Sequence, residues 1–84
     1  MKTELLKMAI AGFEEWDAKH DILEEEWAKG FVTEAECEKA YETMWEFADE
    51  ASRILRDMSN GKLDFTDARN LVFYRTKEVK ALCL

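Results

Sequence analysis

Apolar residues recur in alternating steps of three and four along two long stretches of this chain, and this period limits the possible folds more than any other feature. The first stretch is Leu6, Ala9, Phe13, Trp16, His20, Leu23 and Trp27. The second is Cys37, Tyr41, Met44, Ala48, Ala51, Leu55 and Met58. This spacing places side chains on one face of an α-helix, so both stretches predict long amphipathic helices. The chain has no proline, which would cost a helix interior about 3 kcal/mol.

Local signals divide the 84 residues into three helices. Gly30 stands where a left-handed residue commonly ends a helix. Thr33 and Glu36 have the spacing of a capping box, which marks the start of the second helix. Ser59–Gly61 favours a turn, and Asp64 is placed to cap the third helix. The predicted helices span about residues 3–29, 34–58 and 65–82.

Short connections between helices favour antiparallel neighbours. The sequence therefore predicts an all-α fold, a single domain over residues 1–84 built as an up-down-up three-helix bundle. The third helix is expected to carry one seam formed by Phe65, Ala68, Val72, Arg75, Val79 and Leu82. The first helix is longer than the third, so one end of its seam should lack a partner within the chain. That end leaves room for a ligand or for a second copy.

The formal net charge of −7 argues against direct nucleic-acid binding, which requires Lys and Arg to neutralise phosphates. Residues 1–30 carry eight acidic against four basic side chains, residues 31–58 eight against three, and residues 59–84 three against five. The first two helices are therefore acidic and the third is mildly basic. An acidic surface favours a basic protein partner, although the same charge also serves solubility alone.

Two cysteines, Cys37 and Cys83, fall in no metal-ligand spacing and are too few for a disulfide-stapled secreted domain. Reduced thiols indicate a cytoplasmic protein. Charges interrupt every apolar window, so we expect neither a signal peptide nor a membrane span.

No catalytic set emerges from the sequence, because there is no Gly-rich phosphate loop and no defensible Cys/His pair. We therefore expect no enzyme, no cofactor and no metal. His20 lies on the first seam, where it is either a proton donor, ligand or pH switch, or a core-edge residue bonded to a neighbouring carboxylate. A metal site would need further ligands at matching positions.

The third helix offers one surface suited to an anion. Arg75 interrupts its apolar seam, and a buried guanidinium there must pair with a carboxylate or extend its head to water. Together with Arg69 and Lys77 it could instead bind a small anionic ligand such as a nucleotide.

The acidic faces of the first two helices are the predicted partner-binding surface. Carboxylates at intervals of about 6 Å along a helix can imitate the phosphates of a nucleic acid, although ordinary surface helices share the pattern. Trp45 and Phe73 lie off the apolar seams, where they are either exposed interface anchors or residues at a helix boundary. The predicted partner-binding residues are Glu24, Glu25, Glu38, Glu42, Trp45, Glu46 and Phe73.

These features favour a non-catalytic binding module, a stoichiometric inhibitor or adaptor that docks onto a basic nucleic-acid-binding protein. In size, acidity and lack of catalytic motifs the chain is similar in type to the accessory and inhibitor proteins of phages and mobile elements. The alternative is a self-assembling helical protein, a homodimer or higher oligomer, with a small-anion pocket at Arg69, Arg75 and Lys77.

Overall fold

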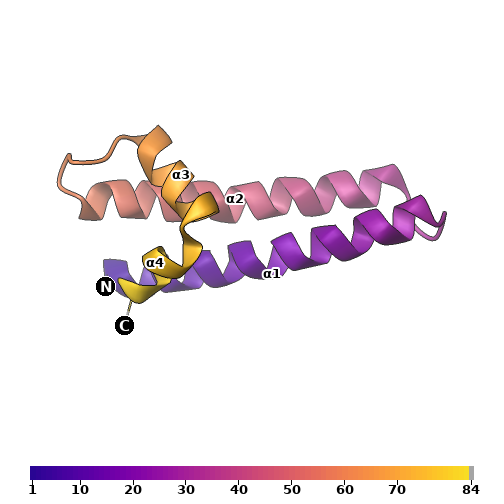
Figure 1. The fold of residues 1–84 in the computed structure, drawn as a ribbon, viewed down its shortest axis with the longest axis horizontal. Coiled ribbons are helices and arrows are strands. Elements are labelled where there is room, and N and C mark those ends of the chain that lie inside the picture. The colour runs from indigo at the N-terminus through magenta and orange to yellow at the C-terminus, as the bar shows by residue number, and fades with distance from the viewer. Residues whose placement is uncertain (84) are drawn as a thin grey trace.

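The computed structural model describes residues 1–83, which form helices and connecting turns without a β-strand (Figure 1). The elements in chain order are α1 (Lys2–Ala28), α2 (Glu34–Met58), α3 (Phe65–Tyr74) and α4 (Thr76–Ala81). The all-α prediction is confirmed. No helix among the described residues is long and apolar enough to cross a membrane.

The residues predicted to end and to cap the helices do so in the structure. Gly30 follows α1 with a φ of 81°, which glycine adopts without the steric cost of a Cβ. The capping box is complete, because the Glu36 amide donates to Thr33 Oγ1 at 3.3 Å and the Thr33 amide donates to Glu36 Oε2 at 2.9 Å. Asp64 caps α3 by accepting the Asp67 amide at 2.7 Å.

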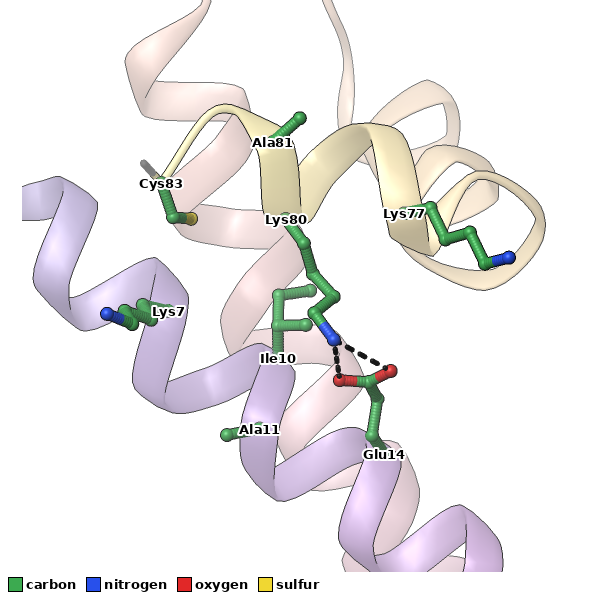
Figure 2. Close-up of a pocket in the computed structure, with 8 residues that line it drawn as sticks. All are labelled: Lys7, Ile10, Ala11, Glu14, Lys77, Lys80, Ala81 and Cys83. Atoms are coloured by element: carbon green, nitrogen blue, oxygen red, sulfur yellow. Dashed lines mark hydrogen bonds and ion pairs between the residues drawn. The ribbon is translucent and has the colours of Figure 1, made fainter.

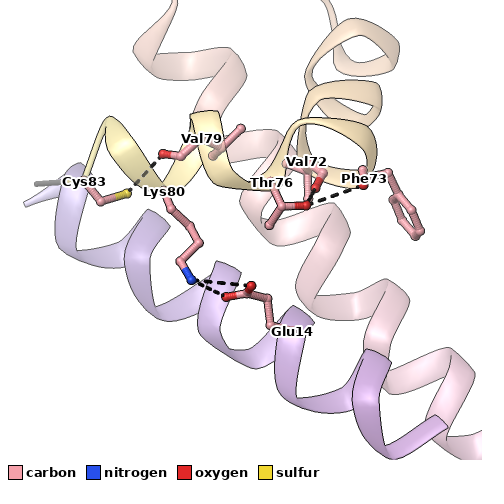
Figure 3. Close-up of polar contacts among 7 residues, drawn as sticks. All are labelled: Glu14, Val72, Phe73, Thr76, Val79, Lys80 and Cys83. Atoms are coloured by element: carbon pink, nitrogen blue, oxygen red, sulfur yellow. Dashed lines mark hydrogen bonds and ion pairs between the residues drawn. The ribbon is translucent and has the colours of Figure 1, made fainter. Parts of the chain in front are cut away.

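The prediction of one continuous helix over residues 65–82 is wrong, because the chain breaks at Arg75, whose φ and ψ are −129° and 40°. The Thr76 hydroxyl donates to the Val72 carbonyl at 2.6 Å and so takes the place of a backbone donor (Figure 3). Threonine competes with the backbone in this way and bends helices. The break turns α4 onto α1, where Val79 and Cys83 become buried.

This break also changes the architecture, and the up-down-up bundle is not confirmed. α1 and α2 form a long antiparallel hairpin, while the shorter α3 and α4 lie across only one end of it (Figure 1). The core gathers at that end, where Leu6, Ile10 and Phe13 of α1 meet Met44 and the rest of the buried seam of α2. Toward residues 29–33, which connect the two helices, only Cys37 and Ala40 are buried. We call this half the hairpin tip.

Candidate functional site

The hairpin tip carries an open groove between α1 and α2, with a volume of about 330 Å³. Four carboxylates, three rings and one thiol line it, and these residues are His20, Glu24, Trp27, Glu34, Cys37, Glu38, Tyr41 and Glu42. We call this feature the acidic groove. It stays open because α3 and α4 do not extend to the C-terminal end of α1, where the apolar seam packs against α2 alone. The greater length of the first helix predicts such an uncovered end.

Two aromatic rings in the acidic groove face solvent. Trp27 is 48% exposed and Tyr41 is 47% exposed, although both occupy apolar seam positions. The Tyr41 ring contacts His20, with 5.2 Å between ring centroids, and Trp45, with 6.1 Å. An open aromatic surface beside charged groups is typical of a contact site for a partner.

No Lys or Arg side chain lines the acidic groove beside its carboxylates. Glu34, Glu38 and Glu42 follow one another at i,i+4, where like charges destabilise a helix by about 0.2–0.5 kcal/mol per pair. Within residues 1–83, none of the three has a Lys, Arg or His nitrogen within 4.0 Å. Glu24 is partnered on its own helix by His20, with 3.3 Å between Oε1 and Nε2.

Cys37 lies beneath this rim of carboxylates. Its thiol donates to the Leu23 carbonyl across the hairpin, with 3.3 Å between sulfur and oxygen. Burial, followed by the nearby charges of Glu24 and Glu36, raises the pKa of the Cys37 thiol above its usual value. The sulfur is therefore held as a thiol, which is a poor nucleophile and a poor metal ligand.

A neighbouring site on α2 shows how a basic side chain sits on this surface. The Arg69 guanidinium of α3 lies over the Trp45 ring, 3.9 Å from the ring centroid. Its Nε is 3.3 Å from Asp49 Oδ1, and this ion pair is only partly exposed. Arg69 thus makes two contacts at once, a cation–π contact with the Trp45 ring and an ion pair with Asp49, which lies one turn further along α2.

The structure brings together three of the predicted partner-binding carboxylates, Glu24, Glu38 and Glu42, in the acidic groove. Glu25 and Glu46 do not line it. Successive residues turn by about 100° around a helix, so Glu25 projects away from Glu24. Each step of four residues along a helix rotates the side-chain direction by about 40° around the helix axis, so Glu46, the next residue in the series after Glu42, lies outside the groove.

Of the two alternatives for Phe73, an exposed interface anchor or a residue at a helix boundary, the structure agrees with the helix boundary. Its ring contacts Phe13, with 5.0 Å between centroids, and Trp45, with 4.5 Å. Phe73 and Trp45 are half-buried and pack against the core. α3 lies across the hairpin (Figure 1), so its Phe73 ring reaches Phe13 of α1 and Trp45 of α2. These two rings connect α3 to the hairpin.

The predicted anion-binding residues do not form one site. Arg69 is held by Trp45 and Asp49, on a different surface from the other two. Arg75 is not on a buried seam, because its side chain is 62% exposed and pairs with Glu78 at 2.8 Å. This hydrogen bond raises the pKa of Arg75. Arg75 and Lys77 share a shallow depression with Glu14 and Glu78, whose charges balance theirs.

His20, Asp21 and Glu24 place their donor atoms within 4.8 Å of one another, so they are the metal-ligand combination that the described residues offer. All three lie on one helix, and Asp21 and Glu24 are exposed. His20 instead contacts Tyr41 and Glu24, which fits the core-edge interpretation of its position.

Sequence reasoning missed Trp27, Tyr41 and Glu34 as surface-site residues. Trp27 and Tyr41 fall in the apolar seams and were assigned to the core by that pattern. The signal that could have identified them is the end of the third helix, because seam residues beyond its reach have nothing to cover them. Glu34 was recognisable as the first member of the series with Glu38 and Glu42.

The chain was compared with protein-family models, with curated proteins and with solved structures, and none of the three comparisons gave a match.

Proposed function

We propose that this protein is a non-catalytic binding module that holds a basic helical segment of a partner protein in the acidic groove. The observation that carries the proposal is the set of four groove carboxylates around two exposed rings, with no Lys or Arg in the lining. Such a surface suits an arginine side chain, which can stack on a ring and pair with a carboxylate together.

The Arg69 contact supports a helix as the bound element. α3 already lies on α2 with its arginine between Trp45 and Asp49. Tyr41 continues the aromatic row one turn toward the hairpin tip, and Glu38 and Glu42 supply carboxylates beside it. A partner helix with arginines at every fourth position would extend the same arrangement past the end of α3.

Basic helices of this kind are common in nucleic-acid-binding proteins, where Lys and Arg neutralise phosphates. A helix held in the acidic groove has its arginines occupied by carboxylates and cannot contact phosphates at the same time. We therefore propose a stoichiometric inhibitor or adaptor of a basic nucleic-acid-binding protein in the cytoplasm. Electrostatic steering would speed the encounter and make it salt-sensitive.

The test measures fluorescence anisotropy of a labelled alanine-based helical peptide with arginine at every fourth position. In the triple variant Glu34→Gln, Glu38→Gln, Glu42→Gln we expect affinity to fall about five- to hundredfold, from about 1–3 kcal/mol over three exposed pairs. The control Glu4→Gln, Glu25→Gln, Glu46→Gln removes the same charge outside the groove and should change Kd less than about twofold. Equal weakening by both variants would refute the groove as the binding site.

The aromatic contribution is measured with the same peptide. Replacing its arginines by lysines keeps the charge but loses the planar stacking group. We expect weaker binding of the lysine peptide to the wild-type protein and a smaller difference between the two peptides in Trp27→Ala. The same arginine preference in both proteins would exclude stacking on Trp27.

A further inference from the structure

A second groove lies at the opposite end of the molecule, between α1 and α4 (Figure 2). Its volume of about 400 Å³ is within the range of about 300–1,000 Å³ typical of small-molecule sites. The lining residues are Lys7, Ile10, Ala11, Glu14, Lys77, Lys80, Ala81 and Cys83. We call it the basic-rimmed groove. It shares no residue with the acidic groove, so it is a separate feature.

The floor of the basic-rimmed groove is aliphatic. Ile10 of α1 and Cys83 reach into the space between α1 and α4, and Ala11 and Ala81 lie at its edges (Figure 2). Lysine stems add further apolar surface while their ammonium groups stay in water. No aromatic ring lines this groove, so a flat aromatic ligand would have no stacking partner here. An alkyl chain fits this lining better.

The rim carries three lysines against one carboxylate, in a protein whose net charge is −7. Lys80 reaches from α4 to Glu14 of α1, with 3.1 Å between Nζ and Oε1 (Figures 2 and 3). Lys7 has no carboxylate within 4.0 Å in the described part of the chain. It precedes Glu14 by two helical turns, about 10 Å along α1, so the Lys80–Glu14 ion pair and the ammonium of Lys7 lie at opposite ends of the groove.

We infer that the basic-rimmed groove binds a medium-chain aliphatic carboxylate, with its chain on Ile10, Ala11 and Ala81 and its headgroup paired with Lys7. A lone ammonium suits a single carboxylate, whereas bidentate recognition would call for arginine. At the other end of the groove Glu14 is already paired with Lys80, and the Lys77 side chain extends away from that pair (Figure 2), so Lys7 is the ammonium left for the headgroup. This inference does not depend on the function proposed for the acidic groove.

Three probes separate the contribution of the chain from that of the charge. Decanoate carries both, acetate carries the charge alone, and decyltrimethylammonium carries the chain with the opposite charge. Amide chemical shifts measured during titration should move around Lys7, Ile10 and Ala81 with decanoate and stay unchanged with acetate. Each buried methylene tightens binding about fourfold, so decanoate should bind at least about tenfold tighter than hexanoate. Equal binding of decyltrimethylammonium would overturn the inference.

Two matched pairs of variants locate the site. Lys7→Glu should weaken decanoate at least about fivefold, whereas Lys39→Glu, with the same net charge, should leave it unchanged. Ala11→Phe fills the groove from an exposed position and should abolish binding, while Ala18→Phe, also exposed on α1, should have no effect. Circular dichroism checks that all four variants are folded. Unchanged decanoate binding in folded Ala11→Phe would overturn the assignment.

Discussion

Gly12 provides a test of how α1 and α2 pack, because its expected response to substitution opposes helix propensity. An added Cβ at Gly12 would lie 2.5 Å from Cε1 and 2.7 Å from Cγ of Phe47. Glycine in a helix interior costs about 1 kcal/mol relative to alanine, so propensity alone predicts that Gly12→Ala stabilises the protein. Overpacking costs about 1–3 kcal/mol, and the ring of Phe47 must leave its place to relieve it.

We therefore expect Gly12→Ala to lower the free energy of unfolding by about 1 kcal/mol, which in a domain of this size lowers Tm by about 4–8 °C. In a Phe47→Ala background the clash is gone, and the same substitution should raise stability by about 1 kcal/mol. The coupling between the two sites is thus about 2 kcal/mol.

The assay is thermal and urea unfolding of the wild type, both single variants and the double variant, followed by circular dichroism. Ala18→Gly, at an exposed position of α1, calibrates helix propensity on the same helix and should cost about 1 kcal/mol. A Gly12→Ala protein more stable than the wild type, or the same change in both backgrounds, would refute the close approach of Phe47 to α1.

Three further predictions concern the break in the third helix and two titratable groups. Thr76→Val leaves the Val72 carbonyl without its hydroxyl donor and should lower the free energy of urea unfolding by about 0.5–1.5 kcal/mol. An unchanged free energy of unfolding would show that this hydrogen bond does not stabilise the break between α3 and α4. Burial and the nearby charge of Asp21 raise the pKa of Asp17 above 3.8, and the charge of His20 offsets only part of this shift. The folded protein therefore keeps the Asp17 proton at pH values where the unfolded chain has lost it. The stability that comes from binding this proton is lost as the pH rises, so Asp17→Asn should be more stable than the wild type at pH 7 and should lose this advantage below about pH 3.8. A difference in the free energy of urea unfolding that stays constant over this pH range would contradict the raised pKa. Cys37, whose pKa is raised, should react with iodoacetamide at pH 7 at least about tenfold more slowly in the native protein than in urea, and mass spectrometry of the alkylated peptide would expose a reactive thiol.

Helix positions and caps could be predicted from the sequence because they depend on local signals. The three-and-four period, the Thr33–Glu36 capping box and Gly30 act within a few residues, and the structure keeps them. The break at Arg75 could not be predicted from periodicity, because Val72 and Val79 continue the apolar seam across it. The break depends on the Thr76 hydroxyl and on the burial of Val79 against α1, which is a tertiary contact.

The candidate site was partly predictable for the same reason. Glu24, Glu38 and Glu42 were recognisable as a charged surface, but which seam residues stay uncovered depends on where α3 and α4 lie. Once the third helix breaks, its two pieces cover one end of the hairpin, and Trp27 and Tyr41 become exposed.

Two of the three tryptophans of the chain report directly on whether the acidic groove receives a basic helix. Trp27 lines the groove, whereas Trp16 packs against the core outside it. We would record indole N–H signals by NMR during titration with the arginine peptide. If the peptide binds in the groove, the Trp27 signal moves with the bound fraction and the Trp16 signal stays in place. Movement of Trp16 with a stationary Trp27 would contradict binding in the groove.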